Sequence, residues 1–314
     1  MTRRRAPGAS QSPDRLRIEQ LTESYRFDGE LAALLTRFQY QADGIELTAA
    51  EPRPLPTDQL QPATAGLQSV VESGSSLVFV CYDDRTHTMV NPIETALIEA
   101  ISTTVHPTGR PRPDGGTGRT LGEGPHGDGP QEASRETEPY SPSQPATQPS
   151  MGVVTPHNAQ RGALDAVLPN AITANTVEKY QGGERDIIAV SATVSDPQFA
   201  RTEERFILNP RRLLVAISRS RLLTIVVCST ALFEVAPQDS ERLDDGPVWA
   251  RLFTQAVGAD ADPAWTGSLG EFIADSSHAH AGVPVRVYPS TIGTDDSAGA
   301  TPATLGGVPI DDDA

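Results

Sequence analysis

The sequence is poor in lysine, cysteine and long apolar runs. Lys179 is the only lysine in 314 residues, so arginine carries nearly all the positive charge of a chain whose net charge is -16. Cys81 and Cys228 are the only cysteines, and both lie inside apolar runs, which predicts small core residues and excludes a disulfide framework. No apolar run approaches the roughly 20 residues that a transmembrane helix needs, and the N-terminus has no apolar signal core. We therefore expect a cytoplasmic protein without a membrane partner.

Two kinds of chemical site are also missing from the sequence. No Cys/His cluster has the spacing of metal ligands, and the segment SSHAHAG, which contains His278 and His280, has no third ligand nearby. No G-x-x-x-x-G-K-[ST] phosphate loop occurs, and no Asp-Glu pair at the end of a buried strand precedes Leu16. We therefore expect neither a metal site nor a self-contained nucleotide site.

The acidic excess, with arginine in place of lysine, leads us to hypothesise a salt-rich cytoplasm. There, negative charge keeps the surface hydrated while salt screens self-repulsion over about 3 Å at 1 M. The hypothesis is wrong if the folded protein gains no stability between low and molar KCl.

Short apolar runs alternate with segments of helical spacing along much of the chain. Strands are expected at 76–83, 151–155, 189–194, 222–229 and 283–289, and helices at 28–40, 91–103, 212–221 and 248–256. Asp28 and Asn91 are the expected N-caps of the first two helices, with Pro92 at the first helical position and Glu94 in the first turn. Because strands that alternate with helices form parallel sheets, we predict an α/β fold with a parallel sheet and helices on both faces.

Composition divides the chain into segments. Between His106 and Ser150 there is almost no large apolar side chain, so this stretch cannot bury enough surface to offset its ordering entropy. We predict a flexible lead at 1–15, one domain formed by 16–106 and 151–236, a disordered insert at 107–150, a C-terminal extension at 237–292 and a disordered tail at 293–314.

Four segments occur in the order found in one helicase family. They are LTESYRF, GVVTPHNAQ, TVEKYQGGERDIIAVSA and NPRRLLVAISRSR, and NPIETA lies between the first two. Together they resemble the motifs of the second, C-terminal RecA-like domain of superfamily 1 helicases, in the group of the nonsense-mediated-decay helicase and the replication helicase-nucleases. The resemblance covers roughly residues 16–230. It implies a RecA-like, P-loop NTPase-type sheet that lacks the lobe with the phosphate loop.

The resemblance implies that two arginines reach the γ-phosphate of ATP, and by position these are Arg26 and Arg219. Arginine suits this role because it stays charged and offers a planar fork of donors to phosphate. In phosphoryl transfer, such an arginine finger is worth about 10³–10⁵ in rate. We expect Arg219 on a helix just before a buried strand. The alternatives are a surface residue for Arg26 and, for Arg219, a helix-face arginine paired with Glu203 or Glu204.

The resemblance also implies a nucleotide-binding group formed by Tyr25, Gln181, Gly182 and Glu184, with Glu184 at the sugar. Glycine in this position allows close approach of the backbone to a ligand. The alternative for this segment is a plain turn that enters a strand, with Glu184 solvated.

Thr155 and Thr176 are expected at strand ends, where hydroxyl and backbone N–H groups could hold nucleic-acid phosphates. The alternative for each is a capping or turn threonine. His157 stands where the family often has tyrosine, which could weaken a packing contact.

A basic island supports a phosphate site. Residues 201–221 contain six arginines and two glutamates, a local net of 6 − 2 = +4 on a chain of net charge -16. Such an island fits a dedicated phosphate site better than broad attraction.

These features lead to one functional hypothesis and one rival. The hypothesis is the C-terminal half of an ATP-dependent DNA or RNA helicase, which uses ATP and Mg²⁺, with the Mg²⁺ ligands on a separate N-terminal lobe or partner chain. Such a half would be either a split subunit or a truncated remnant, inactive alone. The rival is a non-catalytic RecA-like module that binds nucleic acid or protein.

Overall fold

A seven-stranded sheet with the strand order β5-β4-β6-β7-β3-β9-β8 lies at the centre of the protein. The structure, a computed structural model, describes residues 23–24, 28–41, 44–49, 54–107, 148–177, 179–180, 184–238 and 246–292. The strands from β5 to β3 run parallel, whereas β9 runs antiparallel to both β3 and β8. The predicted RecA-like α/β sheet is confirmed, and it is extended by an antiparallel pair.

The central strands are short and rich in β-branched side chains. Their bounds are β3 Leu77–Tyr82, β4 Met151–Thr155, β5 Thr173–Thr176, β6 Arg185–Ser191, β7 Ser220–Ser229, β8 Trp265–Ser268 and β9 Pro284–Pro289. A separate parallel pair consists of β1 (Glu23–Ser24) and β2 (Thr48–Ala49). Every residue of β3 and β4 is buried, as expected for parallel strands covered on both sides.

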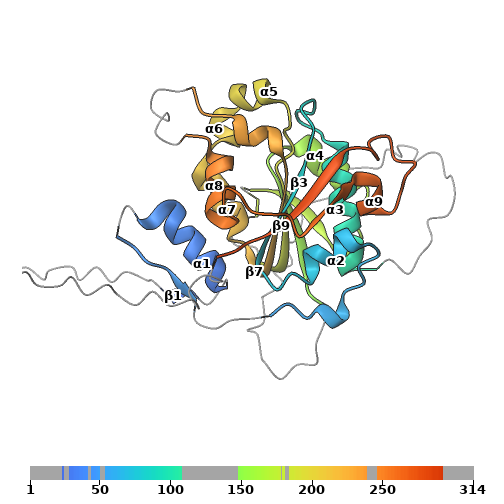
Figure 1. Ribbon diagram of the computed structural model, residues 1–314, viewed down its shortest axis with the longest axis horizontal. Coiled ribbons are helices and arrows are strands. Elements are labelled where there is room, and N and C mark those ends of the chain that lie inside the picture. Colours follow the sequence, from blue (N-terminus) through green and yellow to red (C-terminus); the bar gives the residue numbers. More distant parts are fainter. Residues whose placement is uncertain are drawn as a thin grey trace, which may run out of the picture.

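Helices cover both faces of the sheet (Figure 1). On one side lie α1 (Gly29–Leu35), which continues into the π-helical turn Thr36–Tyr40, together with α7 (Pro210–Ile217) and α8 (Val248–Ala256). On the other lie α2 (Ala65–Val71), α3 (Pro92–Val105), α4 (Asn158–Asp165) and α9 (Leu269–Ile273). The remaining short helices are α5 Pro197–Thr202, α6 Glu204–Ile207, η3 Thr57–Gln59 and η4 Thr230–Glu234.

Alternating side chains build two hydrophobic cores. Leu77, Phe79 and Cys81 of β3 pack in the core with α1, α7 and α8, whereas Val78 and Val80 pack in the core with α2, α3 and α9. This is the two-residue period of a strand read on both faces. Cys81 is the register partner of Cys228 on β7, and both are buried and free.

Helix starts follow the predicted capping residues. Asp28 accepts a hydrogen bond from the Glu30 backbone N–H and caps α1. Asn91 accepts from the N–H groups of Ile93 and Glu94, with Pro92 at the first helical position of α3. Within the described ranges, no helix is long and apolar enough to cross a membrane.

Several expectations differ from the structure. The strand expected at 189–194 spans Arg185–Ser191. The predicted helix 212–221 ends at Ile217, and β7 begins at Ser220, because β6 pairs with this segment from Arg185 onward. Strand β5 was not predicted, since TANT has little apolar character. The C-terminal extension is expected at 237–292, and its described residues 246–292 add β8 and β9 to the main sheet. The segments 1–15, 293–314 and most of 107–150 lie outside the described residues.

The parallel strands give the sheet two distinct edges. We define the amino edge as the residues that precede and begin β3, β4, β6 and β7. The carboxyl edge comprises the residues that end and follow β3, β4, β5 and β6. Among the described site residues, Glu184 and Arg219 lie at the amino edge, and Thr155 and Thr176 lie at the carboxyl edge.

Candidate functional site

Glu184 and Arg219 are neighbours at the amino edge. Glu184 immediately precedes β6, and Arg219 immediately precedes β7. The two strands are adjacent and parallel, and the Arg185 backbone N–H donates to the Arg219 carbonyl over 3.3 Å. Two predicted nucleotide-site residues, far apart in the sequence, are therefore brought together by strand pairing.

Arg219 does not stand on a helix, which corrects the sequence expectation. It lies in the turn between α7 and β7, and its Nε donates to the Val215 carbonyl over 3.1 Å. Because that carbonyl belongs to the last turn of α7, the bond ties the base of the guanidinium to the helix end. The side chain is half-buried, so the local fold limits its orientation.

Glu184 is paired rather than simply solvated. Its Oε2 lies 3.4 Å from Nε of Arg221, and the two side chains are 26% and 27% exposed respectively. The Glu184 backbone carbonyl accepts from the Arg185 guanidinium over 2.8 Å. The amino edge thus holds mixed charge that solvent can reach.

A cavity of about 510 Å³ opens at the same edge. Its lining includes Asp28, Leu222 and the segment 74–76 before β3. Glu30 on α1 accepts hydrogen bonds from the Ser75 hydroxyl and from both the N–H and the hydroxyl of Ser76, over 2.8–3.0 Å. Burial raises the pKa of Glu30, although these bonds oppose the shift. The start of α1 is therefore anchored beside the beginnings of β3 and β7.

Several predicted site residues lie outside the described residues: Tyr25, Arg26, Gln181 and Gly182. The expected meeting of Arg26 with Arg219 therefore stays a prediction. Asp28, two positions along the chain from Arg26, lines the same cavity as Leu222, three positions from Arg219.

Thr155 and Thr176 end adjacent strands at the carboxyl edge and are register partners. Both side chains are buried, with 0% and 6% exposure. The Thr155 hydroxyl lies 2.9 Å from the hydroxyl of Thr193. The structure thus brings the two threonines together below the surface, and Thr155 joins a buried polar network.

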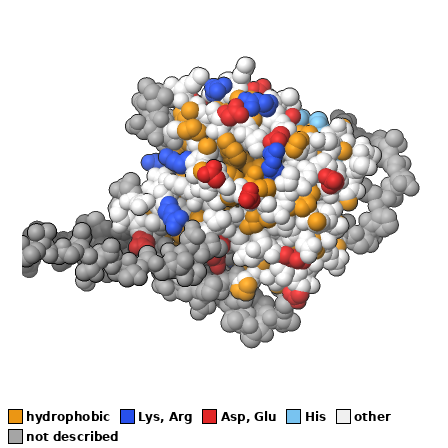
Figure 2. Space-filling view, in the orientation of Figure 1, with side chains coloured by type: hydrophobic (Ala, Val, Ile, Leu, Met, Phe, Trp, Pro, Cys, Tyr) orange, Lys and Arg blue, Asp and Glu red, His pale blue; other side chains and the backbone are white. Residues whose placement is uncertain are grey.

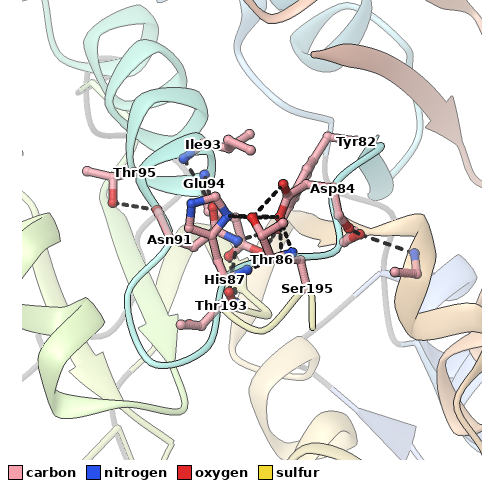
Figure 3. Close-up of polar contacts among 12 residues, drawn as sticks. Tyr82, Asp84, Thr86, His87, Asn91, Ile93, Glu94, Thr95, Thr193 and Ser195 are labelled. Atoms are coloured by element: carbon pink, nitrogen blue, oxygen red, sulfur yellow. Dashed lines mark hydrogen bonds and ion pairs between the residues drawn. The ribbon is translucent and has the colours of Figure 1, made fainter. Parts of the chain in front are cut away.

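The network centres on Glu94, which is fully buried in the first turn of α3 (Figure 3). Its Oε1 accepts from the Tyr82 hydroxyl over 2.8 Å, and its Oε2 accepts from the Thr193 N–H over 2.8 Å and from the Ser191 hydroxyl. The Asn91 amide donates to the Tyr82 hydroxyl and to the Thr193 carbonyl. Burial raises the pKa of Glu94 to about 7, and the three hydrogen bonds only partly offset that rise.

Thr193 carries backbone strain at the heart of this network. Its φ is 67°, in the left-handed region that a β-branched residue rarely adopts. Such a residue persists only where its surroundings hold it, and strain of this kind gathers at functional sites. Here the Glu94 carboxylate and the Asn91 amide hold the Thr193 N–H and carbonyl.

A second cluster ties the loop after β3 to the loop after β6. Asp84 accepts from the Ser195 hydroxyl and from the Thr86 N–H, and lies 2.8 Å from the His87 ring. The Ser195 N–H donates to the His87 carbonyl. Burial opposes ionisation of Asp84, yet the bonds from Ser195, Thr86 and His87 hold its pKa well below its usual range. Because the Ser195 hydroxyl donates to Asp84 rather than to an imidazole, the cluster fixes loops and does not activate a nucleophile.

His157 keeps an aromatic contact in place of the family's tyrosine. Its ring stacks on Phe206 at 5.7 Å, and the Arg212 guanidinium lies 4.1 Å from the same Phe206 ring. Burial lowers the pKa of His157, so the neutral ring is favoured. On the face seen in Figure 2, basic and acidic side chains are intermixed rather than gathered into one basic surface.

The sequence alone does not predict the Glu94 network. The segment NPIETA indicated a cap at Asn91 and a first-turn Glu94, but first-turn glutamates are usually solvated. No spacing rule places Thr193 beside them. No group of three or more His, Cys, Asp or Glu residues in the part described by the structure could hold a metal ion.

Comparison with known proteins finds similarity over the part of the chain that contains the last three motifs. A family described as an AAA domain matches residues 138–231. A probable RNA helicase (armi) of Drosophila melanogaster is 34% identical over 100 residues, which are 28% of this chain and 8% of that protein. The DNA polymerase alpha-associated DNA helicase A of Saccharomyces cerevisiae is 36% identical over 83 residues, 25% of this chain and 12% of that protein. The chain thus matches only a small part of either relative. These matches confirm the resemblance drawn from the motifs.

Proposed function

We propose, on the premise that residues 138–231 are an AAA domain of the helicase type, that this chain supplies the arginine side of an ATP site shared between two RecA-like lobes. The adjacency of Glu184 and Arg219 at the amino edge carries the proposal. A guanidinium and a carboxylate at the same sheet edge suit a ligand with phosphates at one end and sugar hydroxyls at the other.

In this proposal each amino-edge residue has one task. Arg219 and Arg26 contact the γ-phosphate, and Glu184 accepts hydrogen bonds from the sugar. Tyr25, Gln181 and Gly182 complete the nucleotide contacts. The bond from Arg219 to the end of α7 limits the freedom that its guanidinium would lose on binding phosphate. The ion pair with Arg221 holds the Glu184 carboxylate at this edge.

ATP with Mg²⁺ fits these residues as one half of a site. The cation neutralises charge on the phosphates during phosphoryl transfer. Glu184 is already paired with Arg221, so the proposed Mg²⁺ ligands lie on the first lobe, in a partner chain or in a further segment of a longer protein.

Nucleic acid is proposed to contact the carboxyl edge, at the opposite end of the parallel strands from the amino edge. The buried Thr155 and Thr176 end the strands there, and α5, α6 and the start of α7 carry Arg201, Arg205 and Arg211 close by. Arginines beside strand ends suit phosphate contacts, which fix register without reading sequence. Both DNA and RNA fit this description, and a cytoplasmic location goes with the proposal.

ATP binding by the full chain tests the arginine role. Titration calorimetry with Mg-ATP and Mg-ADP should show tighter binding of ATP, because only ATP offers the γ-phosphate. Arg219→Ala should remove this preference, a loss of about tenfold in ATP affinity. Arg211→Ala is the matched control, since Arg211 is exposed at the opposite end of α7.

Two outcomes contradict the proposal. Equal losses in both variants would remove Arg219 from the site. Robust phosphate release by the chain alone would remove the shared-site idea. If ATP does not bind but a single-stranded oligonucleotide does, the non-catalytic binding module is the better reading.

A further inference from the structure

The carboxyl edge is organised around a buried acid with neutral partners. The carboxylate of Glu94 accepts hydrogen bonds from two hydroxyls and one backbone N–H, those of Tyr82, Ser191 and Thr193. The titratable groups packed around it are Tyr82 on β3 and Cys228 on β7, with Asp84 close to Tyr82. Each of these groups is neutral or negative, so the buried charge is stabilised by donors alone.

The carboxylate holds a conformation that the backbone disfavours. Thr193 has a φ of 67°, and its N–H is fixed by Glu94 while its carbonyl is fixed by Asn91. Without these two anchors, a threonine in the left-handed region would relax toward an extended conformation. The turn that follows β6 therefore depends on the state of Glu94.

A hydrogen bond links Thr193 to the end of β4. Its hydroxyl lies 2.9 Å from the Thr155 hydroxyl and 3.1 Å from that of Ser191. Thr155 in turn is the register partner of Thr176. Gln160 on α4 joins the same network, because its Oε1 accepts from the Asn91 N–H over 2.8 Å. One carboxylate thus sets the positions of the loops after β4 and β6.

We infer that Glu94 is a positioning residue for nucleic-acid contact: its ionised carboxylate holds Thr193, and through it Thr155, in the arrangement that binds a single strand. This inference rests on the proposed function, which puts nucleic acid at the carboxyl edge. Glu94 itself is fully buried and touches no ligand.

Protonation supplies a natural way to release the arrangement. A proton on Oε1 can be accepted by the Tyr82 hydroxyl, whereas a proton on Oε2 competes with the Ser191 hydroxyl and the Thr193 N–H for that oxygen. In either case the bond from the Thr193 N–H weakens, because a charged acceptor binds an N–H more strongly than a neutral one. With the pKa of Glu94 raised to about 7 by burial, the ionised fraction rises from about 10% at pH 6 to about 90% at pH 8.

Amide NMR of the full chain tests the positioning directly. The amide signals of Thr155 and Thr193 should titrate together with a midpoint near the pKa of Glu94, about 7. Glu94→Gln should abolish this titration, and Glu99→Gln, which removes a carboxylate from the same helix, should leave it unchanged. Tyr82→Phe removes one donor from the carboxylate and should move the midpoint to higher pH, which keeps the test open if Glu94→Gln fails to fold.

Binding links the switch to function. The probe is a 12-nucleotide oligo-dT carrying a dye that does not titrate, with fluorescence anisotropy as the readout. The ratio of the wild-type affinity to the Glu94→Gln affinity should rise by up to about tenfold from pH 6 to pH 8, following the ionised fraction. Taking the ratio cancels the effect of histidine protonation on binding, because both proteins share that effect.

The outcomes separate the inference from the proposed function. Amide signals that do not titrate, or an affinity ratio that stays flat while the amides titrate, would overturn the role of Glu94. An oligonucleotide that binds at no pH would overturn nucleic-acid binding at this edge, and with it the positioning role. Joint titration of amides and affinity, lost in Glu94→Gln, supports both.

Discussion

The two edges of one sheet are built in opposite ways. At the amino edge, Glu184 and Arg221 form an ion pair that is about a quarter exposed, and the segment before β3 lines a cavity of about 510 Å³. At the carboxyl edge, Glu94 and Thr193 are fully buried, and neutral donors satisfy the acid. Accessible charge can meet a ligand at little cost, whereas a buried polar network fixes backbone and is costly to disturb. The amino edge therefore suits a site that exchanges ligands, and the carboxyl edge suits the rigid support of a site.

The largest expected effect concerns the pH dependence of stability through Glu94. Burial raises its folded pKa from 4.5 to about 7, so between these values the folded state binds more protons than the unfolded state. The contribution of Glu94 to the free energy of unfolding is therefore largest below pH 4.5. It falls by about 3 kcal/mol as the pH rises to about 7. Urea unfolding of wild type and Glu94→Gln at several pH values isolates the effect as their difference. A difference independent of pH would break the contrast between the edges.

The second prediction tests whether the amino edge also contains a rigid point. A Cβ added to Gly152 on β4 would lie 1.6 Å from the Tyr180 hydroxyl oxygen and 2.8 Å from its Cζ. Gly152→Ala should therefore lower the free energy of unfolding by about 1–3 kcal/mol through overpacking. Gly162→Ala in α4 is the matched control: a Cβ there meets nothing within 4 Å, and alanine should stabilise the helix by about 0.5–1 kcal/mol. Equal effects in the two variants would show that Tyr180 moves aside freely.

The smallest expected effect is at the exposed ion pair. Arg221→Ala breaks the contact with Glu184, whose atoms are 3.4 Å apart and whose side chains are 26–27% exposed. Because solvent screens such pairs, the free energy of unfolding should change by less than about 1 kcal/mol. Denaturant titration at low and high salt measures it. A loss of several kcal/mol would mean that the amino edge is structural support like the carboxyl edge.

Much of the scaffold follows from local signals. Strand β3 is a short continuous apolar run, helix α8 has apolar residues at helical spacing, and α3 has Asn91 and Pro92 at its start, so pattern and capping predict them. Strand β5 has no such signal, because its four residues become a strand only by pairing with β4. The border between α7 and β7 moved for the same reason: pairing with β6 draws Ser220 into the sheet.

The candidate sites divide similarly. The resemblance implies that Glu184 and Arg219 belong to one site, and the pairing of β6 with β7 makes them neighbours; their shared site stays a prediction. No sequence pattern predicts the carboxyl-edge network. A glutamate in a first helical turn is usually exposed to solvent, and only the tertiary fold buries Glu94.

The sequence by itself determined the resemblance to helicases, the alternation of strands and helices, and which residue types are available for phosphate chemistry. These rest on local order along the chain, which motifs and periodicity record. Only the tertiary structure decided that Glu94, Tyr82 and Thr193 meet, and that Arg219 stands in a turn rather than on a helix. The physical reason is that burial and strand pairing arise from contacts between distant segments, and no short window of sequence contains both partners.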